Sequence, residues 1–267
     1  MRWRFGDRLR WRIVVIGLSE SRERYARIGY TPARMVQSWL GRFRPQFGMP
    51  FASSPRPHPA STGRACRAIV ATRLQQPTLE WAALRALQFG WFCTDLQMDE
   101  DDALREVLSA VPGLDARAVI AALDDSAVGD AYESDRAATR TAAGTPTEAQ
   151  GKSAKTDGPV RYTAPSVVFT TADGRTLEAG GFQSVDAYDV CVANLDPGLP
   201  RRAAPDDPLD ALAAFEHGLT TQEVAAVMAP PLTAPDRPAA LARLVELAAE
   251  GRVTRVPLGD DALWRAA

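Results

Sequence analysis

The chain has 267 residues, of which 46% are hydrophobic, and its formal net charge at pH 7 is −2. A chain of this length and composition can bury a sizeable core and has room for more than one domain. The near-neutral balance gives no global charge argument for binding nucleic acid or a membrane surface.

The charges are nevertheless unevenly distributed. Residues 1–44 hold 11 Arg against three acidic side chains, whereas residues 99–136 hold 11 acidic side chains against three Arg. Charge runs of this kind usually form solvated faces. We interpret the two segments as faces of one fold that attract each other. A basic surface for an acidic partner is the alternative interpretation.

The N-terminal residues predict the end of a helix followed by a strand. Trp3 and Phe5 precede a Gly-Asp stop signal, and residues 9–18 turn from an alternating to a continuous apolar pattern. A continuous apolar run is typical of a strand in a sheet that is covered on both faces. The apolar run of residues 13–18 is too short for a signal peptide or a membrane span. We therefore expect no association with a membrane.

Residues 30–140 show helical periodicity almost throughout. A proline-rich passage, residues 45–59, interrupts it and is expected to cross the surface. Helix starts are indicated by Pro32, by Thr78 as an N-cap, and by Asp115 as a further N-cap. The other helices of this region are expected at residues 66–74, 104–111 and 126–140.

Two breaks follow this helical region. Residues 141–159 are small and polar, contain Pro and Gly, and offer no apolar anchor, which predicts a mobile loop. Residues 201–208 form a charged linker bounded by prolines. We therefore expect one domain over residues 1–200 and a second, smaller one over residues 207–267.

The most informative stretch covers residues 162–195. Pro165 opens the apolar, β-branched run of residues 166–171, and Asp173-Gly174 is a dipeptide typical of a tight turn. A second short strand is expected around residues 176–178, and a Gly-Gly pair ends it. The stretch thus predicts a β-hairpin that begins at a proline.

The helix after this hairpin completes a recognisable order of elements. Ser184 has the chemistry of an N-cap, and Val185, Tyr188 and Val192 fall on one face of the helix that it starts. Proline, strand, hairpin, strand, glycine pair and helix resemble the C-terminal half of a thioredoxin fold. The stretch is similar to the DsbA-like branch of that superfamily, which includes the FrnE-type proteins. The resemblance covers most of the chain, although only the region around Pro165 is specific.

The resemblance implies an α/β, thioredoxin-like fold over residues 1–200. The helices of residues 30–140 would match the all-helical insertion that separates DsbA-like proteins from plain thioredoxins. Residues 13–18 would be the second strand of the fold. We expect them to lie beside the strand of residues 166–171 in one sheet.

The resemblance also assigns a binding site. In this family the Thr-x-Pro before the third strand carries a cis proline beside the redox cysteines, and here the tripeptide is Thr163-Ala164-Pro165. A cis bond turns the backbone of the preceding residue outward, where it can pair with an extended peptide or a thiol substrate. An ordinary trans proline at a strand edge is the alternative interpretation.

The cysteines do not supply the chemistry of the family. Thiol–disulfide exchange uses a low-pKa thiolate with a second thiol three residues on. Cys66, Cys93 and Cys191 are far apart and form no C-x-x-C, so we interpret all three as small core hydrophobes and leave the catalytic residues unknown. An odd number of cysteines without a disulfide framework favours a reducing, cytoplasmic compartment.

The resemblance therefore predicts a DsbA-family thiol–disulfide oxidoreductase-like protein, or a relative acting on thiol conjugates, that is inactive as given because the C-x-x-C is missing. We expect the natural protein to begin about 20–30 residues before Met1 and to include a C-x-x-C or a Ser/Cys variant, a length set by one strand and one helix. We interpret His58 and His217 as surface residues, because no second ligand stands at metal spacing. No cofactor and no metal are expected.

The last segment, residues 207–267, predicts three helices and a hairpin. A short helix comes first, Thr220 and Glu223 form a capping box for the second, and Asp236 starts the third. Residues 252–266, with a Gly-Asp turn, then predict a β-hairpin. Three helices and a β-wing resemble a winged helix, a tail that also accompanies DsbA-like chains of this type.

This winged-helix-like tail offers an alternative function, that of a non-catalytic interaction or regulatory protein. A protein that reads DNA needs a basic stripe, because much of its binding free energy comes from counterion release. The tail holds five Arg against nine acidic side chains. We therefore expect it to serve homodimerisation or packing within the chain rather than DNA binding.

Overall fold

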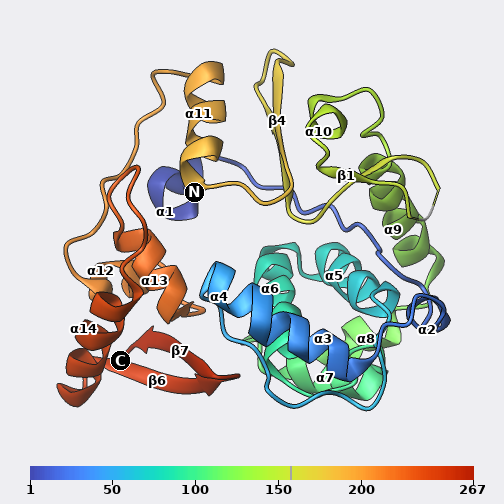
Figure 1. Ribbon diagram of the computed structural model, residues 1–267, viewed down its shortest axis with the longest axis horizontal. Coiled ribbons are helices and arrows are strands. Elements are labelled where there is room, and N and C mark those ends of the chain that lie inside the picture. Colours follow the sequence, from blue (N-terminus) through green and yellow to red (C-terminus); the bar gives the residue numbers. More distant parts are fainter. Residues whose placement is uncertain (157) are drawn as a thin grey trace. The chain divides into compact units, whose positions relative to one another are not determined.

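The computed structural model describes residues 1–156 and 158–267. It combines helices with short antiparallel strands, which confirms the α/β expectation at the level of mixed helix and sheet (Figure 1). Every helix among these residues is too short or too polar to cross a lipid bilayer.

Two compact units form, and each is interrupted in sequence by the other. Unit 1 contains residues 1–18 and 130–203, and unit 2 contains residues 19–129 and 204–267. Most of the helices expected as an insertion therefore belong to the same unit as the C-terminal tail. The expected division into a thioredoxin-like domain and a separate tail domain stays a prediction.

Unit 1 is built around a β-hairpin. Strand β3 (Ser166–Thr170) pairs antiparallel with strand β4 (Thr176–Gly180) through a tight turn. Helix α11 (Val185–Leu195) follows, and the Ser184 hydroxyl caps it by accepting the Ala187 N–H at 3.1 Å. The predictions of both strands, the turn and the N-cap are confirmed.

One face of this hairpin carries the core of unit 1. Phe169 is buried on this face, against Val192 of α11 and Phe5 at the end of the short helix α1 (Arg2–Phe5). The opposite face is more open, because the Val168 side chain in the middle of β3 is 53% exposed. On that face Glu178 of β4 accepts the N–H of Thr147, so the described residues of unit 1 cover this face at β4 and leave it open at Val168.

The prediction of a strand at residues 13–18 is wrong. These residues pair with no strand, and side chains in and after helix α9 (Ser126–Thr139) bind their main chain instead. Asp135 accepts the Val15 N–H at 3.0 Å, and Arg140 donates to the carbonyl of the next residue at 2.8 Å. Because these groups already have partners, no neighbouring strand is needed to satisfy them. The expected pairing of this segment with β3 is absent.

Residues 141–159, predicted as a loop without an anchor, contain regular structure. Helix α10 (Pro146–Ala149) and strand β1 (Ser153–Ala154) lie within the stretch. Thr147 is buried, so the segment has an anchor that its composition does not reveal. Residue 157 lies outside the described residues, and the mobility of the loop stays a prediction.

Unit 2 begins with helices whose caps agree with the sequence. The Asp115 carboxylate accepts the Ala118 N–H at 3.0 Å, and the Thr31 hydroxyl accepts the Arg34 N–H at 3.3 Å. Four of the helices pack on one another. In chain order the segment contains α2 (Glu23–Arg27), α3 (Pro32–Ser38), a π-helical turn (Trp39–Phe43), α4 (Arg44–Phe47), and the packed helices α5 (Gly63–Gln75), α6 (Glu80–Cys93), α7 (Asp101–Ser109) and α8 (Ala116–Ala121).

The prediction of Thr78 as an N-cap is wrong. Pro77 starts a separate 3-10 turn (Pro77–Leu79), so α6 begins only at Glu80 and no side chain caps its first residue. Glu80 instead forms an ion pair with Arg73 at 2.6 Å. An acidic side chain in the first turn also favours the helix through the positive end of its dipole.

Ion pairs join the basic and acidic segments within each unit. In unit 2 the Nε of Arg22 lies 2.7 Å from the carboxylate of Asp99, and its Nη2 lies 3.0 Å from Glu100. In unit 1 Arg12 lies 3.7 Å from Asp135. These pairs agree with the interpretation of two faces that attract each other.

The tail of unit 2 contains the predicted helices and hairpin. The capping box is present, because Thr220 and Glu223 each accept the other's backbone N–H, at 3.2 and 2.9 Å. Three strands form an antiparallel sheet in the order β5-β7-β6, with Trp264 completely buried beneath it. The elements are α12 (Pro208–Ala213), β5 (Leu219–Thr220), α13 (Thr221–Met228), α14 (Arg237–Ala249), β6 (Val253–Leu258) and β7 (Asp261–Ala266).

Gly17 supplies a test of how residues 13–18 are held. Its φ is +61°, and an added Cβ would overlap the hydroxyl of Tyr132 on α9. Gly17→Ala is expected to lower the free energy of unfolding by about 3 kcal/mol, from backbone strain and overpacking together. Gly151→Ala is the control, because Gly151 has a φ of +66° with nothing near its Cβ; it should cost about 1 kcal/mol. Equal losses in urea denaturation would contradict the packing of this segment on α9.

Candidate functional site

The tripeptide Thr163-Ala164-Pro165 connects strand β2 (Arg161–Tyr162) to β3. The Ala164–Pro165 peptide bond is cis, which confirms the expectation for this bond. Ala164 and Pro165 are exposed, and Thr163 is partly buried. The structure thus places the three residues on the surface of unit 1, while their role in substrate binding stays a prediction.

Hydrogen bonds hold this tripeptide from both sides. The Thr163 hydroxyl donates to the carbonyl of Lys152 at 2.7 Å, and the Ser166 hydroxyl donates to the Thr163 carbonyl at 2.6 Å. The same Ser166 oxygen accepts the N–H of Gly181 at 3.1 Å. The exposed Ala164 and Pro165 therefore lie between two fixed ends. Less conformational entropy of the protein would be lost when a ligand binds them.

The carboxylate of Glu178 on β4 connects the elements beside the tripeptide through hydrogen bonds. Glu178 accepts the hydroxyl of Tyr162 at 2.6 Å and the backbone N–H of Thr147 at 2.8 Å. Burial acts to raise the pKa of Glu178, but these hydrogen bonds outweigh it and the pKa is lowered. Burial and the bond to Glu178 raise the pKa of Tyr162 to about 12.

At neutral pH this pair is therefore a carboxylate and a protonated phenol. Neither group titrates near pH 7, so the pair suits a fixed hydrogen bond better than proton transfer. Sequence reasoning did not find Glu178. Its partners lie 16 and 31 residues away, and nothing in the alternation of β4 distinguishes it from an ordinary exposed strand residue.

The cysteines lie apart in the structure as they do in the sequence, and none of the three forms a disulfide. Cys93 is buried and its thiol donates to the carbonyl of Pro50 at 3.3 Å. Burial raises the pKa of this thiol to about 12 and also raises that of Cys191. Cys66 and Cys191 are only partly buried, so the interpretation as core residues is confirmed for Cys93 alone. Neither thiol with a raised pKa is a thiolate at neutral pH.

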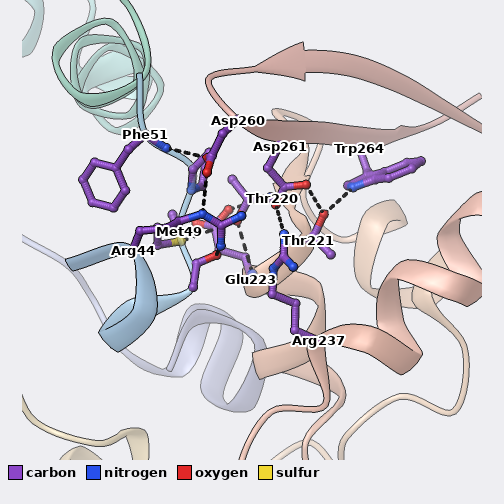
Figure 2. Close-up of polar contacts among 12 residues, drawn as sticks. Arg44, Met49, Phe51, Thr220, Thr221, Glu223, Arg237, Asp260, Asp261 and Trp264 are labelled. Atoms are coloured by element: carbon purple, nitrogen blue, oxygen red, sulfur yellow. Dashed lines mark hydrogen bonds and ion pairs between the residues drawn. The ribbon is translucent and has the colours of Figure 1, made fainter. Parts of the chain in front are cut away.

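In unit 2 the turn of the tail hairpin is bound to the chain near Phe51 (Figure 2). Asp260 accepts the Phe51 N–H at 2.9 Å and donates its own N–H to the Phe51 carbonyl at 3.0 Å. Its second carboxylate oxygen accepts Nε of Arg44 at 2.7 Å. A Cβ at Gly259 would come within 2.7 Å of the Phe51 carbonyl oxygen, so this close approach requires glycine.

A second polar cluster lies beside this turn, under the tail sheet. Asp261 accepts bonds from the Thr221 hydroxyl at 2.9 Å and from Arg237 at 2.8 Å, and the indole of Trp264 donates to Thr221 at 2.9 Å (Figure 2). Every member has a partner within the tail. The cluster therefore serves the packing of the tail, and Arg237 is not available as a free cation.

No protein-family model matches the sequence, and no curated protein matches it. Among the residues that the structure describes, no three His, Cys, Asp or Glu side chains are grouped so that they could hold a metal ion. His58 is exposed and His217 is partly buried. The candidate site is therefore the tripeptide with its anchoring residues.

Tyr162→Phe tests the carboxylate on β4. Loss of the Tyr162 hydroxyl is expected to lower the free energy of unfolding by about 1 kcal/mol at pH 7. The folded-state pKa of Glu178 is below its usual value, so its contribution is present above the unfolded pKa and is lost as the pH falls through the folded one. The cost of the substitution should therefore shrink toward pH 3. Tyr188→Phe is the control, since that phenol does not contact Glu178. A cost of Tyr162→Phe that is independent of pH would contradict the argument.

Proposed function

We propose that residues 162–195 form the C-terminal half of a thioredoxin-like fold of the DsbA-like branch, whose second strand residues 13–18 do not supply, and that Thr163-Ala164-Pro165 binds an extended thiol or peptide substrate. One observation carries the proposal. The exposed and doubly anchored tripeptide leads directly into the β3–β4 hairpin, and α11 packs on one face of that hairpin. This is the order of elements in the C-terminal half of that fold.

The chemistry of the tripeptide supports binding of an extended chain. An exposed backbone whose ends are fixed can exchange main-chain hydrogen bonds with a ligand without much loss of conformational entropy. Ala164 presents a methyl group only, so its own side chain does not obstruct an approaching main chain. The partner is therefore a thiol or peptide substrate and not a nucleic acid.

The proposal does not extend to thiol exchange by this chain alone. Exchange needs a thiolate that attacks one sulfur of a disulfide and a thiol that resolves the mixed disulfide. The sequence contains no C-x-x-C, and the thiols of Cys93 and Cys191 have raised pKa values. The chain as given is proposed to bind substrate without oxidising or reducing it. Three cysteines that form no disulfide favour a cytoplasmic location.

A second candidate function is that of an interaction protein acting through the tail. Three helices and a three-stranded antiparallel sheet resemble a winged helix. However, the hairpin turn that would be the wing is bound by Phe51 and Arg44, and Arg243 is paired with Asp207. These contacts favour packing or homodimerisation over DNA binding.

Binding at the tripeptide is testable with a fluorescein-labelled peptide of about ten residues that alternates Val and Thr around a central Cys. Ala164→Arg is expected to weaken binding about tenfold, a loss of about 1.4 kcal/mol, because the side chain would block the exposed backbone. Ala172→Arg is the matched control, an exposed alanine in the hairpin turn. Fluorescence anisotropy with the full chain measures both. Equal binding by the two variants would contradict the site.

The same preparation is expected not to accelerate the reduction of insulin by dithiothreitol. Acceleration would contradict the proposal of binding without exchange. A gel-shift assay with duplex DNA tests the tail, and no shift is expected; a salt-dependent shift would contradict the preference for packing or homodimerisation over DNA binding.

A further inference from the structure

We propose that the exposed arginines of residues 24–47 bind single-stranded nucleic acid. This surface belongs to unit 2, whereas the tripeptide belongs to unit 1, so the inference does not rest on the proposed function. Its basis in the sequence is an uninterrupted basic stretch. Residues 24–79 hold nine Arg, no Lys and no acidic side chain.

Part of this positive charge is neutralised or buried within unit 2. Nε of Arg44 lies 2.7 Å from the carboxylate of Asp260, and Nε of Arg64 lies 2.5 Å from that of Asp101. The side chain of Arg56 is buried. These arginines serve the packing of the unit and are not available to a ligand.

Three other arginines of the stretch are exposed: Arg27, Arg34 and Arg42. None of the three forms an ion pair in the part of the chain that the structure describes. Glu23, one turn before Arg27 in α2, interacts with it only at longer range. Three positive charges are therefore left for an anion from outside the chain.

The local structure places these arginines on one surface. Nη1 of Arg34 donates to the Gly29 carbonyl at 3.0 Å, which holds the start of α3 beside the loop that follows Arg27. In an α-helix, residues eight apart lie about 80° apart around the axis. The π-helical turn after α3 has wider, i→i+5 hydrogen-bonded turns, so it brings Arg42 back toward the side of Arg34.

Aromatic rings alternate with the arginines along this surface. The rings of Tyr25 and Tyr30 lie 6.2 Å apart, at the two ends of the loop between α2 and α3. The guanidinium of Arg42 lies 5.5 Å from the ring centre of Phe43, which in turn lies 6.0 Å from that of Phe47. All four rings are partly buried, so they are held in place and keep part of their surface open.

This combination favours single-stranded nucleic acid over other anions. The planar fork of Arg matches phosphate oxygens, and unpaired bases stack on aromatic rings whatever their sequence. An acidic polypeptide offers no bases, and a duplex keeps its bases stacked inside. A membrane-binding face needs several exposed apolar side chains. Within residues 20–48, all of which the structure describes, Ile28 is the only large apolar side chain that is exposed.

The salt dependence of binding tests the three arginines. The probe is a fluorescein-labelled uridine oligonucleotide of about 20 residues, and the full chain is titrated by fluorescence anisotropy. Three phosphate contacts predict a slope of log K against log salt of about −2, or a loss of about twentyfold between 50 and 200 mM salt. Arg42→Gln should make this slope shallower by about 0.7. Arg117→Gln, at an exposed arginine of α8, is the matched control and should leave it unchanged.

The combined variant Arg27→Gln, Arg34→Gln and Arg42→Gln is expected to bind at least tenfold more weakly at low salt, with a slope near zero. A wild-type slope retained in this variant would overturn the proposal. So would the absence of binding by the wild-type chain at about 100 μM and 50 mM salt, the weak end of non-specific affinities.

A second measurement leaves the protein unchanged, so it also covers failure of a variant to fold. An abasic oligonucleotide with the same number of phosphates should bind the wild-type chain at least tenfold more weakly, because it has no bases to stack. Phe43→Leu, which keeps an apolar side chain but removes the ring, should weaken binding of the uridine probe about fivefold without changing the slope. Equal binding of the abasic and uridine oligonucleotides would overturn the assignment to nucleic acid.

Competition distinguishes the other anionic partners. Polyglutamate, duplex DNA and vesicles of phosphatidylcholine with about 30% phosphatidylserine are each added at the same total charge as the uridine probe. Each is expected to displace the probe at least tenfold less effectively than unlabelled uridine oligonucleotide. Displacement by any of the three as effective as that by the oligonucleotide would assign the surface to that partner and overturn the proposal.

Discussion

The Val15 N–H, held by the carboxylate of Asp135, illustrates the constraint on which the rest of the structure depends. A buried main-chain group without a partner costs about as much as a lost hydrogen bond, so every irregular segment needs donors and acceptors from elsewhere. The extended N-terminal segment finds them on α9, and Phe51 finds them on Asp260. In both cases the partner is a carboxylate more than a hundred residues away. Side chains far away in the sequence therefore satisfy main-chain groups that neighbouring strands would satisfy in a more regular fold.

The hairpin of unit 1 is the contrasting case. Its covered face is packed by Phe5 and α11, whereas Val168 on the other face and the outer main chain of β3 are open. The exposed tripeptide lies at the entrance to the same strand and is fixed by Thr163 and Ser166. A fixed tripeptide and an open outer main chain thus occur side by side in this hairpin.

Signals that act within a few residues could be predicted from the sequence. The Ser184 cap, the Thr220–Glu223 capping box and the Asp-Gly hairpin turn are all present. Partners far away in sequence could not be predicted. Residues 13–18 have the composition of a buried strand, but their bonds go to Asp135 and Arg140, which no local pattern reveals. Glu178 was missed for the same reason. The proposed resemblance of residues 162–195 to half a thioredoxin fold therefore rests on local elements alone.

The interleaving of the two units has a consequence for synthesis. Unit 1 needs residues on both sides of most of unit 2, and unit 2 needs the tail. A ribosome delivers the chain from its N-terminus at about 5–20 residues per second. The Phe51 N–H therefore cannot bond to Asp260 until that residue is synthesised, more than two hundred residues later. The Val15 N–H likewise cannot bond to Asp135 until that residue is synthesised. The early helices therefore spend many seconds of synthesis with their long-range hydrogen bonds unmade.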